Sequence, residues 1–398
     1  MSVALLAVEV YFVVTNSNRP DFWPDDGDAP YQDMSSGLFS AYVNDDNPDY
    51  EKMKAKGSVL CDFDLDGDLD LYFGYVNSYY FENSGSAFKD RTMEYDIDNS
   101  GCRGLVVGDI DNNGYPDILK WRFMSEFQSD HDCAEYDYEA VCLEDPDCFW
   151  EENNCWNSSE PQFLPHLILM NDGNSSFLTH NFLPSNELPF LHSLGLLDAD
   201  LDGDLDLLAI QEEDDDQFML YLNEGFDDTG APEFEQVYTF YRSYGDISAS
   251  RILAIADYDD DGDQDVYVGR KYGYNWFFEN QTLTGSAGDV TYHSNPEPFF
   301  IEKAVPLGIA DSEVNEIGSM GYGAAWGDYD NDQDFDLYLA NWGVNRLYNN
   351  DDNTFTNVAD IQDVESEELS NGVSWGDYNN DGMLDLWTSN IRNPDDVY

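Results

Sequence analysis

The chain has 398 residues, of which 83 are Asp or Glu and only 16 are Lys or Arg, so its formal net charge is −67. This charge excludes nucleic-acid binding, because neutralising phosphates requires clustered basic side chains and the only basic cluster is Lys52, Lys54 and Lys56. Hydrophobic residues make up 42% of the chain, which is enough for a packed core despite the acidity. No apolar run reaches the roughly 18 residues that a transmembrane helix needs.

The first predicted element is a β-strand over Val8–Val14, the second strand of a repeating unit. Its residues Val10–Val13, continuing to Asn18-Arg19, resemble Leu337–Ala340, continuing to Asn345-Arg346. The wider apolar run Ser2–Val14 could instead be a degenerate signal peptide. However, no Lys or Arg precedes it, Glu9 interrupts it and no small-x-small cleavage site follows. We therefore interpret it as a strand of a repeating unit whose acidic loop is missing.

A ten-residue motif then recurs six times: D-x-[DN]-x-[DN]-[GQ]-x-x-D followed by an aliphatic residue. The copies begin at Asp62, Asp109, Asp198, Asp257, Asp328 and Asp377, with spacings of 47, 89, 59, 71 and 49 residues. Short β-rich runs flank each copy, such as Val59-Leu60 and Leu71–Phe73, and a third run often ends in an Asn-containing turn. A unit of strand, acidic loop, strand, turn and strand every 40–50 residues or so is typical of a propeller blade.

The acidic loop has the chemistry of a site for a hard cation. Positions 1, 3, 5 and 9 of the six copies are Asp62, Asp64, Asp66 and Asp70, then Asp109, Asp111, Asn113 and Asp117, then Asp198, Asp200, Asp202 and Asp206, then Asp257, Asp259, Asp261 and Asp265, then Asp328, Asp330, Asp332 and Asp336, and finally Asp377, Asn379, Asp381 and Asp385. Four such side chains repel one another unless a divalent ion lies between them, and all-oxygen ligation with a backbone carbonyl at position 7 favours Ca²⁺. The sequence therefore predicts up to six calcium ions.

An EF-hand is excluded, because position 12 is never the bidentate Glu of that motif and the flanking runs are strands. The six copies are not equivalent. The first, third and fourth are complete, whereas Asn113 replaces Asp in the second, Gln333 replaces Gly in the fifth and Asn379 replaces Asp in the sixth. Fewer carboxylates and a strained turn predict weaker calcium binding by these three copies.

The stretch Trp326–Asn350 resembles an FG-GAP/VCBS repeat, of the kind found in integrin α-subunit propellers and cartilage acidic protein-like proteins. The resemblance covers nearly the whole chain. It implies an all-β fold: a calcium-binding β-propeller, usually of seven four-stranded antiparallel blades, with the cation loop between the first and second strands of a blade. It also implies an extracellular or cell-surface protein.

We expect residues 1–398 to form a single propeller that is cut within a blade at both ends. Either the first and last strands close one composite blade, or the chain is a fragment of a longer protein. Within it, residues 121–163 form an acidic, cysteine-rich insertion.

That insertion contains four of the six cysteines: Cys133, Cys142, Cys148 and Cys155. Their spacing lacks the CxxC pair of a zinc site, so two disulfides are favoured, with three pairings possible. Cys61 and Cys102 either pair or are simply buried. Disulfides indicate an oxidising compartment, and three N-x-S/T sequons, at Asn157, Asn174 and Asn280, are compatible with glycosylation.

The motifs predict a calcium-binding scaffold for adhesion or ligand binding, whose partner is an extracellular protein or glycan. The five histidines are scattered, and no HExxH, GxSxG or phosphate-binding glycine loop is present. The alternative is a calcium-dependent polysaccharide lyase or hydrolase, which would need Lys, Arg or Tyr in a cleft beside a calcium ion. A third interpretation is that the acidity is mainly an adaptation to high salt.

Overall fold

A computed structural model describes the chain between Gly57 and Asn390. Gaps in the description fall at residues 75–76, 84–87, 103, 122–147, 152–153, 158–165, 175, 184–187, 189–190, 212–215, 243–249, 271–272, 285–290, 295, 312–319, 366–369 and 377–381. The predicted strand over Val8–Val14, Cys133, Cys142 and most of the sixth acidic loop lie outside the described residues, so these predictions stay open. The described chain forms two compact units.

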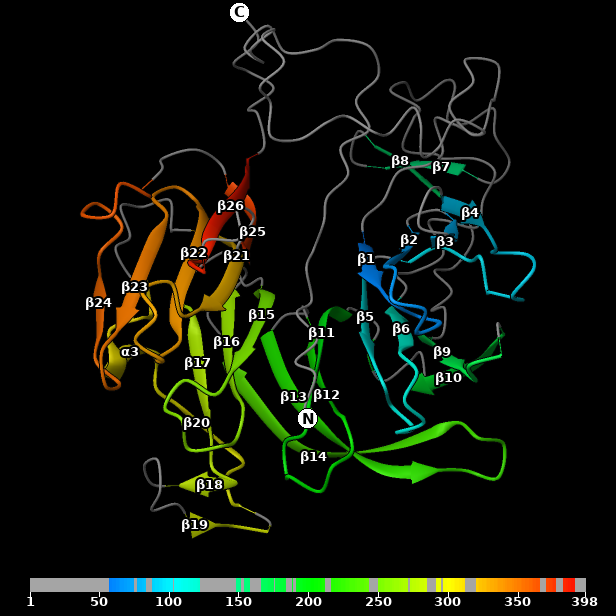
Figure 1. Cartoon of the computed structure of the whole chain (residues 1–398), viewed down its shortest axis with the longest axis horizontal. Coiled ribbons are helices and arrows are strands. Elements are labelled where there is room, and N and C mark those ends of the chain that lie inside the picture. Colours follow the sequence, from blue (N-terminus) through cyan, green and yellow to red (C-terminus); the bar gives the residue numbers. More distant parts are fainter. Residues whose placement is uncertain are drawn as a thin grey trace, which may run out of the picture. The chain divides into compact units, whose positions relative to one another are not determined.

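The first unit contains two four-stranded antiparallel blades (Figure 1). The strands of the first blade, in spatial order, are β1 (Gly57–Cys61), β2 (Asp70–Gly74), β3 (Ser78–Asn83) and β4 (Phe88–Asp90). Those of the second are β5 (Gly104–Gly108), β6 (Asp117–Trp121), β9 (His166–Asn171) and β10 (Phe177–Leu183). A separate hairpin, β7 (Cys148–Glu151) and β8 (Asn154–Asn157), lies within the predicted insertion, between β6 and β9.

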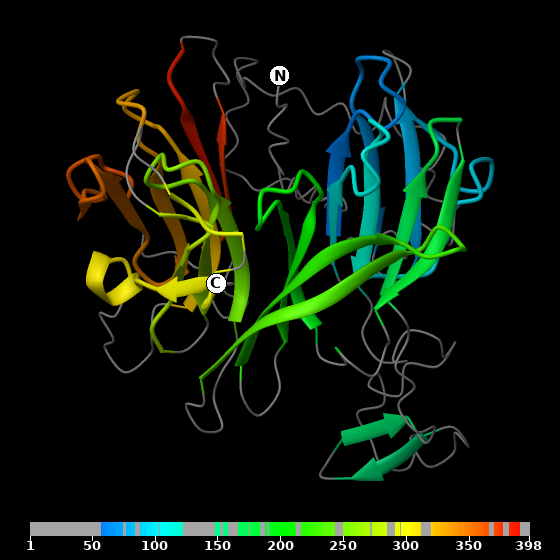
Figure 2. The same cartoon turned by 90° about the horizontal axis from the view of Figure 1, so that it is seen from below.

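The second unit contains three complete blades and a pair of strands (Figure 2). The third blade consists of β11 (Leu191–Leu197), β12 (Asp206–Gln211), β13 (Asp216–Phe226) and β14 (Pro232–Arg242). The fourth consists of β15 (Ser250–Ala256), β16 (Asp265–Arg270), β17 (Trp276–Asn280) and β20 (Phe300–Glu302). A small hairpin of β18 (Leu283–Thr284) and β19 (Thr291–Tyr292) lies between β17 and β20 in the chain, and the helix α3 (Ala304–Leu307) follows β20. The fifth consists of β21 (Met320–Gly327), β22 (Asp336–Trp342), β23 (Arg346–Asn350) and β24 (Phe355–Asn357), and the last pair is β25 (Ser370–Gly376) and β26 (Asp385–Asn390).

This is an all-β β-propeller fold with four-stranded antiparallel blades, as the sequence predicted. The expected number of seven blades is wrong for the described chain, which has five complete blades and a sixth sheet of two strands. The expectation of seven blades followed from the family resemblance. In this chain each acidic loop lies between the first and second strands of one sheet, and the sequence has only six such loops.

The second strand of each complete blade is buried on both faces, because neighbouring sheets pack against it. Every residue of β2, β6, β12 and β16 is buried. Between the third and fourth blades, the rings of Phe218 and Phe278 stack with centroids 4.2 Å apart. Burying one aromatic side chain of this kind contributes about 2–3 kcal/mol to the free energy of folding. Apolar packing between the strands therefore holds neighbouring sheets together.

The first strands of successive blades also contact one another within each unit: β1 with β5, and then β11 with β15, β15 with β21 and β21 with β25. The acidic loops follow these strands and therefore stand in the same place on every blade. Within each unit, that placement brings a loop close to the blade that comes next in the chain.

Candidate metal centres

Each acidic loop closes a β-hairpin in the same register. The residue before position 1 pairs with the position-9 aspartate in all six copies, as in Cys61 with Asp70 and Leu197 with Asp206. Eight residues therefore connect the first and second strands of every blade. The prediction that the loop lies between these two strands is confirmed for the five loops that the structure describes and for the ends of the sixth.

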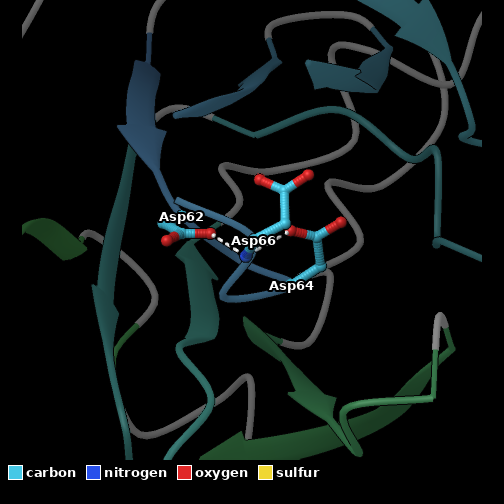
Figure 3. Close-up of side chains that lie close together, drawn as sticks. All are labelled: Asp62, Asp64 and Asp66. Atoms are coloured by element: carbon cyan, nitrogen blue, oxygen red, sulfur yellow. Dashed lines mark hydrogen bonds between the residues drawn. The ribbon is translucent and has the colours of Figure 1, made fainter. Parts of the chain in front are cut away.

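The first loop folds around its position-1 carboxylate (Figure 3). The backbone N–H of Asp66 donates to Asp62 Oδ1 at 3.1 Å and to Asp64 Oδ1 at 3.2 Å. The N–H of Gly67 donates to Asp62 Oδ2 at 3.1 Å. Figure 3 shows the Asp66 nitrogen between the carboxylates of Asp62 and Asp64. The turn thus gathers three acidic side chains that would otherwise repel one another.

The residue at position 6 makes the same hydrogen bond in every described loop, donating its N–H to the position-1 carboxylate at 2.9–3.1 Å. This residue has a positive φ, which glycine adopts without strain in the first four loops, for example 98° at Gly203. In the fifth loop Gln333 adopts a φ of 85°. The predicted strain in this turn is therefore confirmed, and it costs about 1–2 kcal/mol.

The position-9 aspartate is almost completely buried in the five described loops and accepts hydrogen bonds from two directions. In the third loop, Asp206 Oδ2 accepts from Ala199 N–H at 2.8 Å, and Asp206 Oδ1 accepts from Asn223 N–H at 2.9 Å. Asn223 lies on the third strand of the blade, so one carboxylate ties the loop to two strands. Sequence analysis proposed this residue as a cation ligand but gave it no structural role.

Carboxylate oxygens of three aspartates come within 4.8 Å of one another in five loops. The groups are Asp62, Asp64 and Asp66, then Asp109, Asp111 and Asp117, then Asp198, Asp200 and Asp206, then Asp257, Asp259 and Asp265, and finally Asp328, Asp330 and Asp332. Positions 1 and 3 belong to every group. Position 5 completes it in the first and fifth loops, and position 9 in the second, third and fourth. The arrangement thus gathers three of the four predicted side chains in each loop.

Burial makes these carboxylates hard to ionise. It raises the pKa of Asp70 to about 6 and the pKa of Asp206 and Asp336 to about 7. The pKa of Asp198 is also raised, first by burial and then by the charges of Asp202 and Asp200. A bound cation would remove this penalty by neutralising the charge.

The fourth loop is the most enclosed and contains an acidic residue that sequence analysis missed. For Asp263, at position 7, the sequence predicted only the backbone carbonyl as a ligand and gave the side chain no role. The structure buries this side chain, which is 1% exposed. Its Oδ2 accepts a hydrogen bond from Leu283 N–H at 2.5 Å, while its Oδ1 is buried without a partner. Burial, with the neighbouring charge of Asp261, raises the pKa of Asp263 to about 8. The only sequence signal was the acidic residue itself.

The second and sixth loops are the two with asparagine among their predicted ligands. Asn113, at position 5 of the second loop, uses its amide group to donate to the Asn171 carbonyl at 2.8 Å. In the sixth loop, Asp385 opens β26, whereas Asp377, Asn379 and Asp381 lie outside the described residues.

The cysteine and sequon predictions have mixed outcomes. Cys61 and Cys102 are both buried and are not joined by a disulfide, so of the two predicted alternatives the structure has the buried thiols. Side chains in the four-cysteine insertion lie outside the described residues, and its disulfides stay a prediction. Asn174 is exposed, whereas Asn280 is 1% exposed and hydrogen-bonded, so the sequon at Asn280 is closed in the folded protein.

A family model described as an FG-GAP-like repeat matches residues 62–119, 198–268 and 328–388. No curated protein sequence matches the chain significantly. A solved structure of an Agrocybe aegerita lectin, described as recognising non-reducing terminal N-acetylglucosamine, is 15% identical, with a TM-score of 0.44, over 83% of this chain and 73% of that one. Among the described residues, no helix is both long and apolar enough to cross a membrane.

Proposed function

Because the chain is an FG-GAP repeat protein with a β-propeller fold, we propose that it is an extracellular calcium-binding scaffold for adhesion or ligand binding. The proposed propeller spans residues 1–398 and carries the insertion at 121–163. The proposed ligands are the side chains at positions 1, 3, 5 and 9 of the acidic loops, with the carbonyl at position 7.

The observation that carries this proposal is an unsatisfied carboxylate oxygen in the third loop. Asp198 Oδ1 is buried and has no hydrogen-bond partner. Asp198, Asp200 and Asp206 each place a carboxylate oxygen within 4.8 Å of the others. A buried acceptor without a donor costs about 1–3 kcal/mol. A group made only of carboxylate oxygens fits a hard divalent cation, and calcium accepts the six or more oxygens and the irregular geometry of such a loop.

A bound cation supplies positive charge that offsets the repulsion among the loop carboxylates. The chain's own residues shape the loop. In the third blade, Asp206 ties the loop to the second and third strands, and Asp198 closes the turn within the loop. Because the unfolded chain lacks this site, the free energy of calcium binding adds to the stability of the fold. We expect dissociation constants of about 10⁻⁴–10⁻³ M, as in extracellular modules.

Calorimetric titration of the chelator-treated protein with CaCl₂ tests this proposal directly, with MgCl₂ as the cation control. We expect heat from several calcium sites and a higher melting temperature, and little response to magnesium at equal concentration. Asp198→Asn should remove one site, because it deletes a ligand charge. The matched control is Asp228→Asn, an exposed aspartate of the β13–β14 turn. Absence of binding at millimolar calcium would refute the metal site.

The partner class is tested with the calcium-loaded protein. Binding to glycan and extracellular-protein arrays that disappears on chelation would support the scaffold. Release of reducing ends or unsaturated products from acidic or neutral polysaccharides would support the enzyme alternative instead.

A further inference from the structure

The third and fourth loops are connected by a short segment that follows β17. We call residues Asn280–Leu283 the bridging segment. Asn280 Nδ2 donates to the Ala199 carbonyl at 3.0 Å, and Thr282 Oγ1 donates to the same carbonyl at 2.7 Å. Ala199 is position 2 of the third loop. Two side chains that follow β17 of the fourth blade therefore donate hydrogen bonds to one peptide carbonyl of the third loop.

The bridging segment is equally attached to the fourth loop. The backbone N–H of Asn280 donates to Asp265 Oδ1 at 2.8 Å, and the N–H of Leu283 donates to Asp263 Oδ2 at 2.5 Å. Asn280 is 1% exposed and Thr282 is fully buried. Three of the four residues of the bridging segment therefore make hydrogen bonds to two acidic loops that lie about 60 residues apart in the sequence.

The asparagine contact recurs at other blade pairs, which argues against an accident of one loop. Asn171 Nδ2 donates to the Phe63 carbonyl at 2.8 Å, and its N–H donates to Asp117 Oδ1. Asn350 Nδ2 donates to the Tyr258 carbonyl at 3.0 Å, and its N–H donates to the position-9 aspartate of its own blade. In each case the asparagine ends the third strand of one blade and contacts position 2 of the preceding loop.

The held peptide group is well placed to affect cation binding. The Ala199 residue lies between Asp198 and Asp200, two members of the clustered carboxylates. Tyr292, on β19, adds a hydrogen bond from its hydroxyl to the Asp200 carbonyl at 3.2 Å. These hydrogen bonds hold the backbone from which the side chains of Asp198 and Asp200 extend. Cation binding therefore costs less conformational entropy than it would in an unrestrained loop.

We propose that Asn280 and Thr282 are positioning residues for the third cation loop and couple its occupancy to that of the fourth. This inference rests on the proposed function, since it requires that the loops bind calcium. Ordering of the fourth loop orders the bridging segment, which in turn orders the third loop. By linkage the coupling acts equally in the other direction.

Hydrogen-exchange mass spectrometry during a calcium titration tests the proposal, because peptides covering residues 198–206, 257–265 and 328–336 report three loops separately. Thr282→Val removes the hydroxyl and keeps the shape. It should raise the calcium midpoint of the third loop about fivefold, which corresponds to one hydrogen bond of about 1 kcal/mol. The midpoint of the fifth loop should not change.

The matched control is Tyr238→Phe, which removes a hydroxyl that donates to the Phe300 carbonyl at 3.2 Å between the same two blades but away from the loops. It should leave all three midpoints unchanged. Tyr292→Phe provides a second test at a side chain that is 54% exposed, where folding is not at risk. We expect this variant to raise the third-loop midpoint about twofold.

Coupling is measured by disabling the fourth loop with Asp259→Asn. The third-loop midpoint should rise about threefold in the otherwise unchanged protein and by less in the Thr282→Val background. If Thr282→Val lowers the melting temperature but leaves the third-loop midpoint unchanged, its role is merely structural and the proposal is wrong. If no loop of the unmodified protein responds to calcium, the proposed function itself fails.

Discussion

Acidification should stabilise the calcium-free protein, which is the reverse of ordinary acid denaturation. Burial raises the pKa of Asp206 and Asp336 to about 7 in the fold, whereas an unfolded chain titrates aspartate near about 4. Between these two values the folded state binds more protons than the unfolded state. The free energy of unfolding must therefore rise as the pH falls through 7, and the gain is complete as the pH approaches 4.

The size of the effect follows from the same two values. Between pH 7 and pH 5, each of these carboxylates gains most of one proton on folding, which is worth about 2 kcal/mol per group. Asp206 and Asp336 are 1% and 0% exposed, so solvent screens neither of them. Protons would thus take over part of the charge neutralisation that we assign to the cation.

Urea unfolding of the chelator-treated protein at pH 5, 6, 7 and 8 measures this dependence, followed by tryptophan fluorescence. The experiments should contain about 0.5 M NaCl, because salt shortens the Debye length to about 4 Å and suppresses general repulsion from the net charge of −67. Asp206→Asn should reduce the pH dependence, whereas Asp228→Asn should not. A free energy of unfolding that is flat or falls between pH 7 and pH 5 would show that these buried carboxylates do not control stability.

Three further outcomes are expected. Gln333→Gly should raise the free energy of unfolding by about 1 kcal/mol in urea titrations, because glycine adopts the positive φ without strain; a destabilised variant would contradict this. Mass tagging of the native protein should leave Cys61 and Cys102 unmodified, because both thiols are buried and burial raises the pKa of Cys61 to about 12; labelling without denaturant would contradict it. Glycopeptide mapping after secretion from a glycosylating host should find any glycan at Asn174 and none at Asn280, and a glycan at Asn280 in folded protein would show that this sequon opens.

The strands and loops were predictable because their signals are local. An apolar run, an eight-residue acidic loop and a second apolar run fix the hairpin and its register within about 20 residues. The strained turn in the fifth loop was also predictable from local sequence, because Gln333 replaces glycine at a position that needs a positive φ. Local sequence therefore predicted the hairpins, their order and the clustering of aspartates at positions 1 and 3.

The remaining features depend on contacts between distant residues. From the sequence, Asn280 belonged only to a turn signal and a sequon, because its partner Ala199 lies 81 residues earlier in the chain. The buried side chain of Asp263 likewise depends on the segment around Leu283 that covers it. The blade count could not be predicted from one motif, because it depends on how many sheets pack side by side rather than on how any one of them folds.

The hydrogen bonds explain why only some loop positions vary among the six copies. Positions 1 and 9 are Asp in every copy, whereas Asn113 occupies position 5 and Asn379 occupies position 3. In the fourth loop, both oxygens of Asp257 accept backbone N–H groups, as do both oxygens of Asp265.

A side chain at position 5, by contrast, accepts one backbone N–H, as Asn113 Oδ1 does from Tyr115 at 2.8 Å. An asparagine amide has a single acceptor oxygen, so it can replace Asp at position 5 but would leave an N–H unpaired at position 1 or 9. Where both oxygens accept backbone N–H groups, these aspartates therefore need no cation to account for their constancy. Asp198 in the third loop is the exception, because its Oδ1 accepts no hydrogen bond, and each constant carboxylate still has lone pairs available for a metal ion.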